Sequence, residues 1–263
     1  MVHPITEVTA MLSNDTCEKL KGMGLEAFLK GVREQQQVGT YAEMPFEERL
    51  AMLIDFVYQD KQATKLKRLI NQAKFRFKDA DSNSIVYPNR QLDKNQILSL
   101  LTCQFLETYT NIIITGFTGS GKTYLGCVIG KAVCRHGKSV LYIRLADLLE
   151  KMAIAGETIG GKLKLLNRLS RYNLLIIDEW ASRIVRPDEA HFLFDLVEQR
   201  YGNSSMLLCT QHPIKEWHNL LGGDANEDSI MDRLVQNAIH VYTGETNMRN
   251  ILSPHPLRPE ENH

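Results

Sequence analysis

The chain reads Gly116-Phe117-Thr118-Gly119-Ser120-Gly121-Lys122-Thr123 directly after the apolar run Ile112-Ile113-Ile114. The eight residues match the G-x-x-x-x-G-K-T pattern of a phosphate-binding loop, and a helical pattern follows them. Glycines allow several main-chain N–H groups to face one phosphate, and the helix N-terminus adds a partial positive charge. We expect Gly116 to Tyr124 to bind a nucleotide, with Lys122 on the outer phosphates and the Thr123 hydroxyl on magnesium. The alternative is a glycine turn that ends in Gly-Lys-Thr by chance.

A second element, Leu174-Leu175-Ile176-Ile177-Asp178-Glu179, is an apolar run that ends in two acids. In a doubly wound sheet, the carboxyl end of a buried strand is where ligands bind. We expect Asp178 to hold magnesium and Glu179 to orient and deprotonate the attacking water. The alternative is a strand end that is capped by solvated acids. The second carboxylate favours a nucleotide hydrolase over a small-molecule phosphotransferase, which needs no water-activating base beside the metal.

Strand and helix patterns alternate from Asn111 onward, and the strands are almost continuously apolar. This rhythm is typical of an α/β fold with a parallel sheet sandwiched by helices. The expected strands are 112–115, 139–143, 174–178, 206–209 and 239–242. The expected helices are 92–107, 124–135, 146–151, 162–171, 187–201 and 228–235.

Residues 8–77 instead repeat apolar positions at intervals of three and four, which predicts a small all-helical unit. Pro45 suits a helix N-terminus, and a further helix is expected to carry the basic run that follows. We therefore expect a helical N-terminal domain over 1–78 that binds DNA or a partner and a polar linker over 79–91. An ATPase domain over 92–252 and a disordered tail over 253–263 would follow.

The bulk composition excludes several classes of protein. Apolar content of 43% and charged content of 24% over 263 residues are ordinary for a globular protein. The longest apolar runs are four or five residues, far short of the ~20 that a membrane helix needs. No secretory leader opens the chain, and the five scattered cysteines form no C-x-x-C pair. We expect a cytoplasmic protein without disulfides or a zinc site.

A basic run lies in an otherwise neutral chain. No acid interrupts it, so this region attracts polyanions although the formal net charge is zero. The expected contacts to the DNA backbone are Lys61, Lys65, Lys67, Arg68, Lys74, Arg76 and Lys78. The alternative is a solvated helix face.

Three further positions are candidates for the hydrolytic site. The strand 206–209 ends in Thr210-Gln211, and either side chain would lie between Asp178 and the γ-phosphate, where it could hold the attacking water. We favour Gln211 over Thr210, and the alternative is a strand-end turn that leads to Pro213. From spacing alone, Arg233 could be a finger for a neighbouring subunit or a surface arginine paired with Asp232 or Asp228. Arg249 is, by the same measure, only a basic residue near the end of the chain.

Together these motifs resemble the IstB-like ATPases of IS21-type transposons, relatives of the helicase loader DnaC in the AAA+ superfamily. The similarity extends from about Leu12 to Arg249. Besides the two motifs above, it depends on several short segments: Phe46-Glu47-Glu48-Arg49-Leu50, Thr210-Gln211-His212-Pro213, Glu216-Trp217, Ile230-Met231-Asp232-Arg233-Leu234-Val235, Gly244-Glu245 and Met248-Arg249. Ala181 departs from the family's usual glycine, and 182–186 is more basic than in many relatives.

The resemblance implies an AAA+ fold and roles that spacing does not reveal. Arg233 matches the family's arginine finger, which acts on a neighbouring subunit. Arg249 matches the arginine that senses nucleotide in its own subunit. Family members bind ATP and Mg²⁺ between subunits, assemble on double-stranded DNA and activate a partner transposase of the IstA type. The expected function is thus an ATP-dependent DNA-binding ATPase for transposition.

Three alternatives stay open at the level of sequence. A DnaC-like replicative helicase loader would share the fold and the motifs. A small-molecule phosphotransferase would need a substrate pocket and would have no use for a helical N-terminus. A nucleotide-dependent adaptor that scarcely turns over is the third, and Glu179 is the feature against it.

Overall fold

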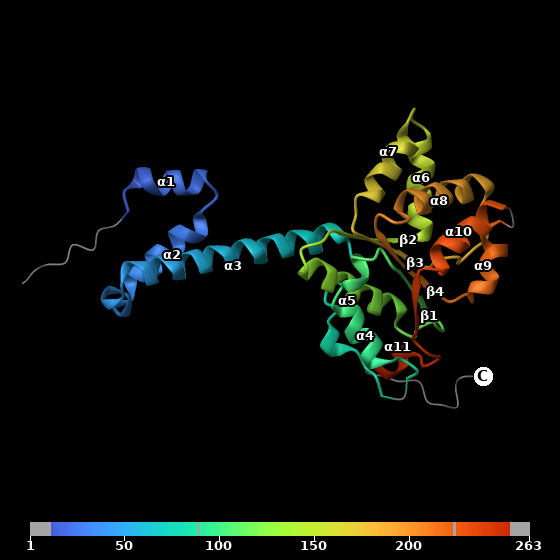
Figure 1. Ribbon diagram of the computed structural model, residues 1–263, viewed down its shortest axis with the longest axis horizontal. Coiled ribbons are helices and arrows are strands. Elements are labelled where there is room, and N and C mark those ends of the chain that lie inside the picture. Colours follow the sequence, from blue (N-terminus) through green and yellow to red (C-terminus); the bar gives the residue numbers. More distant parts are fainter. Residues whose placement is uncertain (1–11, 89, 223–224, 253–263) are drawn as a thin grey trace, which may run out of the picture. The chain divides into compact units, whose positions relative to one another are not determined.

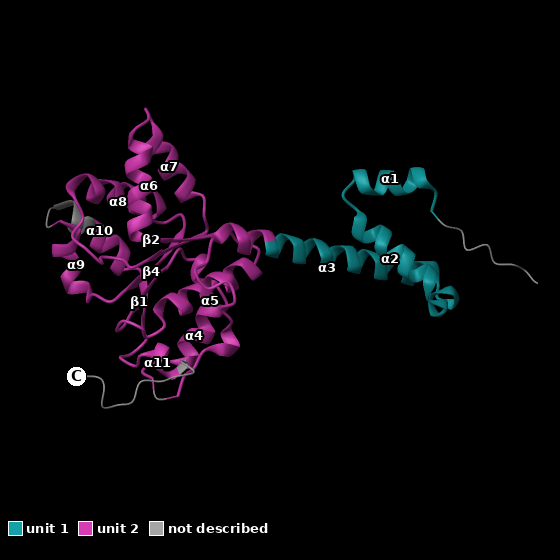
Figure 2. Ribbon diagram, turned by 180° about the vertical axis from the view of Figure 1, so that it is seen from behind, with its two compact units in different colours: residues 1–67 teal, residues 68–263 magenta. Residues whose placement is uncertain are grey.

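The computed structural model describes residues 12–88, 90–222 and 225–252. The chain divides into two compact units, residues 1–67 and 68–263, which Figure 2 colours separately. The division falls inside helix α3 (Phe46–Ala73), before the boundary expected after residue 78. The tail expected over 253–263 lies outside the described residues.

The described part of the first unit is helical, which confirms the expected helical N-terminus. It comprises α1 (Asn14–Gly22), α2 (Glu26–Gln37), the 3-10 turn η1 (Gly39–Glu43) and the larger part of α3. Ser13 caps α1, because its hydroxyl accepts a hydrogen bond from the Thr16 N–H at 3.1 Å. Gly31 allows α2 to approach α3 closely, since a Cβ there would lie 2.8 Å from Leu53 Cδ2.

Helix α3 differs from its prediction in two ways. The apolar pattern from Phe46 and the first part of the basic run, through Arg68, form one continuous helix, because no glycine or proline interrupts them. The helix then ends at Ala73, where Lys74 adopts a left-handed conformation with φ 58°. The expectation of a basic helix from Lys61 to Lys78 is therefore wrong at its end, and Lys74, Arg76 and Lys78 lie beyond the helix.

The second unit has a five-stranded parallel sheet with the order β2-β3-β4-β1-β5 (Figure 1). The strands are β1 (Asn111–Thr115), β2 (Val140–Arg144), β3 (Leu174–Asp178), β4 (Ser205–Thr210) and β5 (Ala238–Tyr242). All five expected strands are confirmed to within a residue or two at each end. The register pairs Ile177 with Leu208 and Thr115 with Thr210, so the carboxyl ends of β3, β4 and β1 share one edge.

Helices cover both faces of the sheet, which confirms the expected sandwich. Figures 1 and 2 show α4 (Lys94–Leu101) and α5 (Lys122–Arg135) on one face. The other face carries α6 (Leu145–Gly156), α7 (Gly161–Ser170), α8 (Pro187–Arg200), α9 (Ile214–Leu221) and α10 (Ala225–Val235). Successive strand residues serve opposite faces: Ile176 and Leu207 approach Gly126 of α5, whereas Leu175 and Leu208 join the core under α6 to α10. This alternation explains why the strands are apolar at every position.

Several elements depart from the predicted boundaries. The helix expected over 92–107 stops at Leu101, because Cys103 is left-handed (φ 62°), and a short 3-10 turn η3 (Gln104–Leu106) follows. The helices α9 and α11 (Met248–Leu252) were not expected. Residues 79–91, expected to be a polar linker, contain the 3-10 turn η2 (Ser82–Ser84) and contact α5 through Tyr124, whose hydroxyl hydrogen-bonds the Asp81 main chain.

All five cysteines are free thiols. Among the described residues, no helix is long and apolar enough to cross a membrane, and no group of histidine, cysteine and acidic side chains has the arrangement of a metal site.

Candidate nucleotide-binding site

The phosphate loop joins β1 to α5 and is held in a conformation that only glycine adopts easily. Gly116, Gly119 and Gly121 have φ of 150°, 83° and 91°. A Cβ at Gly116 would lie 2.2 Å from Thr243 Oγ1, and a Cβ at Gly119 would lie 2.3 Å from Asn247 Oδ1. Gly121 is the N-cap of α5 and contributes no capping side chain. The main-chain N–H groups at the start of α5 are thus available to an anion.

Lys122 folds back over this loop. Its Nζ donates to the carbonyl oxygens of Gly116 and Phe117, both at 2.8 Å. Burial lowers the pKa of the Lys122 ammonium, with a smaller opposing influence from Asp178. The ammonium therefore lies beside the loop, where a bound phosphate could pair with it in place of these carbonyl oxygens.

Asp178 is buried at the end of β3 and is surrounded by donors. Thr123 Oγ1 donates to its Oδ2 at 2.8 Å, the Tyr142 hydroxyl donates to the same oxygen at 2.6 Å, and the Glu179 N–H donates to Oδ1 at 3.0 Å. Burial, and then the hydrogen bond to Asp178, raise the pKa of Tyr142, so it remains a donor. A buried carboxylate beside a threonine hydroxyl is the oxygen donor set that suits Mg²⁺. The motif predicts Thr123 and Asp178, whereas nothing in the sequence predicts Tyr142.

Glu179 has an unusual backbone for a residue with a side chain. It is left-handed with φ 58°, and Ala181 two residues later has φ 54°. Non-glycine residues in this region cost roughly 1–3 kcal/mol and cluster at functional sites. Its carboxylate is about half-exposed and lies 3.7 Å from Arg76 Nη1. Trp180 anchors the turn, because its main-chain N–H donates to the Cys209 carbonyl of β4 at 2.8 Å.

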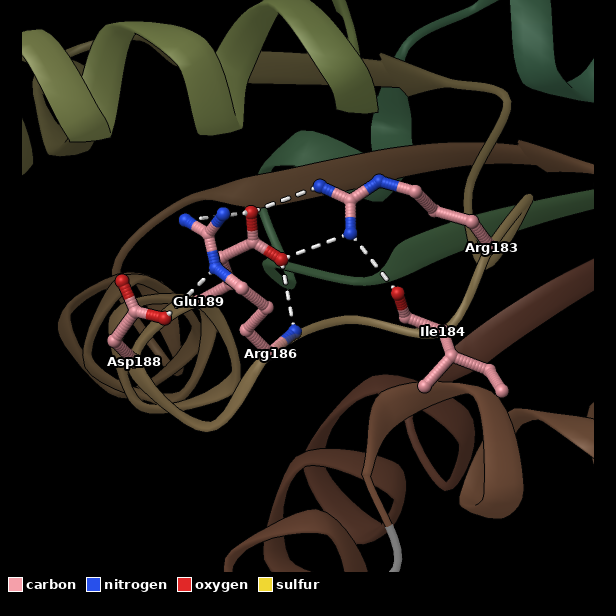
Figure 3. A network of polar contacts seen from close by, with 5 residues as sticks. All are labelled: Arg183, Ile184, Arg186, Asp188 and Glu189. Carbon is pink, nitrogen blue, oxygen red and sulfur yellow. Dashed lines mark hydrogen bonds and ion pairs between the residues drawn. The ribbon is translucent and has the colours of Figure 1, made fainter.

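An ion-pair network fixes the loop that follows the acidic pair (Figure 3). Glu189 of α8 is buried, and its carboxylate accepts two hydrogen bonds from Arg183 at 2.8 and 2.9 Å. It also accepts the Arg186 N–H at 2.8 Å, which caps α8. The Arg183 hydrogen bond and the neighbouring charges hold the pKa of Glu189 below its ordinary value. The arginines of 182–186 thus have a local structural role, because Arg183 and Arg186 both bind the buried Glu189.

Thr210 and Gln211 lie at the same edge, at the end of β4. Thr210 is buried, and its hydroxyl accepts from the His212 N–H at 3.0 Å. Gln211 is exposed, and its Oε1 accepts from Thr118 Oγ1 of the phosphate loop at 2.7 Å. The structure therefore brings both candidates to the loop, and Gln211 contacts it directly.

These elements surround one cavity of about 620 Å³, within the usual range for small-molecule sites. Its wall includes the predicted residues of the loop, the acidic pair, Thr210, Gln211 and Arg249. It also includes an apolar wall that the sequence analysis missed: Phe77, Ile85, Val86, Leu92 and Met248. The ring of Phe77 lies 5.8 Å from that of Tyr124. Ile85 and Val86 come from the segment interpreted as a polar linker, whereas Phe77, Leu92 and Met248 come from the segments before it, after it and near the end of the described chain.

Arg90 is another residue that sequence reasoning missed. Its Nη2 donates to the carbonyl oxygens of Ser120 at 2.5 Å and Thr243 at 3.3 Å, and its Nη1 donates to Val86 at 2.9 Å. Burial lowers the pKa of this guanidinium. Arg90 thereby ties the phosphate loop to the chain after β5. A single arginine in a polar stretch carries no signal of this role.

The two other arginines lie in different surroundings. Arg249 lines the cavity, and its charge affects Lys122. Arg233 of α10 does not line it: its guanidinium pairs with Glu198 of α8 and lies 5.9 Å from the ring of Phe194 and 5.7 Å from that of Tyr201. Glu198 is thus a partner of Arg233 that spacing along the sequence did not suggest.

The candidate DNA-binding residues are all exposed but do not form one group. Lys61, Lys65 and Lys67 belong to the first unit, and Arg68 begins the second unit on the same helix. Lys74 and Lys78 follow the helix, and Arg76 lines the nucleotide cavity.

Comparison with known proteins gives one consistent family. Residues 18–253 match the model of the family described as IstB-like ATP binding protein. A protein of Sinorhizobium fredii that is assigned as an insertion sequence ATP-binding protein is 31% identical over 241 residues, which cover 91% of this chain and 98% of the relative. The replicative helicase loader DnaC of Buchnera aphidicola is 30% identical over 136 residues, covering 50% of this chain and 52% of the loader.

Among solved structures, AMPPCP-bound DnaA from Aquifex aeolicus superposes with a TM-score of 0.53 at 20% sequence identity, covering 68% of this chain and 56% of DnaA. This likeness concerns the fold and supports the AAA+ assignment. The family model covers nearly the whole chain, including the phosphate loop and the acidic pair. The chain therefore belongs to the IstB-like ATP-binding proteins of insertion sequences, within the AAA+ fold.

Proposed function

We propose that this protein is a Mg²⁺-dependent ATPase that assembles on double-stranded DNA and assists a transposase of its insertion sequence. The observation that carries the proposal is the single cavity in which the phosphate loop, Asp178 and Glu179 converge. A protein that only bound nucleotide would need the loop, but it would not need a half-exposed carboxylate beside the metal-binding aspartate.

Each residue of the cavity has a proposed role in hydrolysis. The loop amides and Lys122 bind the phosphates, and Thr123 and Asp178 hold the magnesium ion. Magnesium, when bound, neutralises the charge of the β- and γ-phosphate oxygens. Glu179 accepts a proton from the attacking water, and Gln211 or Thr210 orients that water. Arg249 contacts the phosphates from the same subunit.

We propose that ATP lies between subunits and that Arg233 completes the site of a neighbour. Arg233 is absent from the cavity of its own chain, so it is available to this role only in an oligomer. The exposed lysines and arginines of α3 would contact the DNA backbone, and such binding is salt-sensitive and largely independent of sequence. The helical N-terminal part would bind DNA or the transposase. The five free thiols agree with a cytoplasmic location.

A helicase loader is the second candidate, because the DnaC of Buchnera aphidicola is similar over half of this chain. The similarity to the insertion sequence protein extends over 91% of the chain, so transposition is the better supported proposal. Co-purification with a transposase, or with a replicative helicase, would distinguish the two.

The central test compares the intact protein with Lys122→Ala and Glu179→Gln. We expect Lys122→Ala to lose ATP binding. Glu179→Gln would bind ATP, form the ATP-dependent oligomer on duplex DNA, and hydrolyse roughly 10²- to 10⁴-fold more slowly. Glu157→Gln, an exposed carboxylate at the end of α6, is the matched control. Hydrolysis by Glu179→Gln at the parental rate would contradict the proposal, and stimulation by a metabolite instead of DNA would favour a phosphotransferase.

A further inference from the structure

Arg76 belongs to the basic run, but its position in the fold separates it from the rest of that run. After the left-handed Lys74 the chain packs against α5. Phe75 is buried against Gly130, and a Cβ at Gly130 would lie 2.5 Å from the ring of Phe75. Lys131 Nζ donates to the carbonyl oxygens of Lys78 at 3.2 Å and Ala80 at 2.6 Å. The backbone on both sides of Arg76 is thereby fixed, and its side chain lines the nucleotide cavity.

In that cavity, Arg76 is the cation that contacts Glu179. Arg76 Nη1 lies 3.7 Å from Glu179 Oε1, and both side chains are about half-exposed. Arg144 is also near enough to influence Glu179, but its guanidinium is held by two hydrogen bonds to Asp147 at 2.7 and 2.9 Å. Within the described part of the chain, Arg76 is therefore the residue paired with the carboxylate that we propose to be the base.

We propose that Arg76 is a positioning residue that restrains Glu179 in the DNA-free protein, and that a phosphate of the DNA backbone releases Glu179 by pairing with the Arg76 guanidinium. This inference rests on the proposed role of Glu179. Exposed ion pairs of this kind are weak and screened, so a phosphate anion can displace the carboxylate. The DNA backbone could supply that phosphate, since Lys74 and Lys78 on either side of Arg76 are exposed.

The test measures kcat and KM for ATP, with and without saturating duplex DNA, in Arg76→Gln and Arg76→Lys. We expect Arg76→Gln to raise kcat without DNA by about 2- to 5-fold at unchanged KM, because an exposed pair biases an equilibrium by only a few-fold. Arg76→Lys keeps the charge and would stay near the parental rate. Arg135→Gln is the matched control, because Arg135 forms a similar exposed pair, 3.5 Å from Asp81, outside the cavity.

The measurement with DNA tests the release of Glu179. If Arg76→Gln also reduces the stimulation of hydrolysis by DNA, the DNA backbone supplies the phosphate that pairs with Arg76. If the stimulation by DNA is unchanged, DNA does not act through Arg76 and the inference is overturned. A parental or lower kcat, or a raised KM, would overturn the inference, and a raised KM would make Arg76 a nucleotide ligand instead.

Two further variants separate this inference from the proposed function. If Glu179→Gln is inactive and Arg76→Gln hydrolyses at the parental rate, only the role of Arg76 is lost. If Glu179→Gln retains parental activity, Glu179 is not the base, and the proposed restraint of Glu179 by Arg76 is overturned as well. The double variant Arg76→Gln/Glu179→Gln should match Glu179→Gln alone. Should neither the parental protein nor Arg76→Gln turn over, the inference is overturned, while ATP binding by the parental protein would still support the binding site.

Discussion

The nucleotide cavity and the surroundings of Arg233 are two regions of the same AAA+ fold, and they differ in how many of the proposed catalytic groups each contains. The cavity gathers the loop, both acids, Gln211 and Arg249 from one chain. Arg233 packs on α8 with Glu198 and two aromatic rings, and it does not line the cavity. The comparison teaches that one chain supplies every proposed catalytic group except the finger, which is what an active site shared between subunits requires.

The largest expected effect concerns the finger. Arg233→Ala should leave ATP affinity unchanged and lower the hydrolysis rate of the DNA-bound oligomer by roughly 10³-fold or more, because an arginine finger stabilises the charge of the transition state. The measurement is steady-state hydrolysis with saturating duplex DNA. Glu198→Gln is the control, because it removes the same ion pair but leaves the arginine in place.

Mixing sharpens this prediction. When the Arg233→Ala protein and the Glu179→Gln protein are mixed, some subunit interfaces contain an intact Glu179 from one subunit and an intact Arg233 from the other. The mixture should therefore recover activity that neither variant has alone. Absence of recovery in oligomers shown to be mixed would place Arg233 outside the shared site.

A second prediction concerns the glycine loop of the cavity. Gly119→Ala should reduce ATP affinity by roughly 10- to 100-fold, since a side chain at φ 83° is strained and its Cβ would meet Asn247. Gly202→Ala is the control: its φ is 68°, with no atom within 4 Å of the added Cβ. ATP titration followed by calorimetry measures both. Equal losses in the two variants would mean that backbone strain alone, rather than the loop's close contacts, determines the effect.

The smallest expected effect concerns the loop between the two regions, where Glu189 holds Arg183 (Figure 3). Glu189→Gln should lower the free energy of unfolding by about 1–3 kcal/mol at neutral pH, because a buried, charge-assisted contact is lost. The folded-state pKa of Glu189 lies below its ordinary value of 4.5, so this stabilisation is present above pH 4.5 and disappears as the pH falls through the folded pKa. Thermal melts from pH 7 to pH 3 should show the two proteins converging. A constant difference across this range would contradict the ionic explanation.

Much of the site could be predicted because its signals are local. The loop glycines, Lys122 and Thr123 are required at fixed positions by the backbone that surrounds a phosphate. The position of Asp178 follows from an apolar strand that ends in acids, since parallel strands place their carboxyl ends at one edge. Arg90, Tyr142 and Phe77 escaped prediction because each acts through partners far away in sequence, such as Thr243 for Arg90 and Asp178 for Tyr142. No period or spacing encodes such contacts.

The sequence by itself determined the alternation of strands and helices, the phosphate loop and the acidic pair, because burial patterns and backbone conformation depend on neighbouring residues. Only the tertiary structure divided the basic run, leaving Lys61 and Lys65 on an exposed helix face and placing Arg76 beside Glu179. The physical reason is that charge is a property of composition, whereas the partner of a charge depends on where the helix ends and what the following residues pack against. In this chain the left-handed Lys74 and the packing of Phe75 on Gly130 decided that partner.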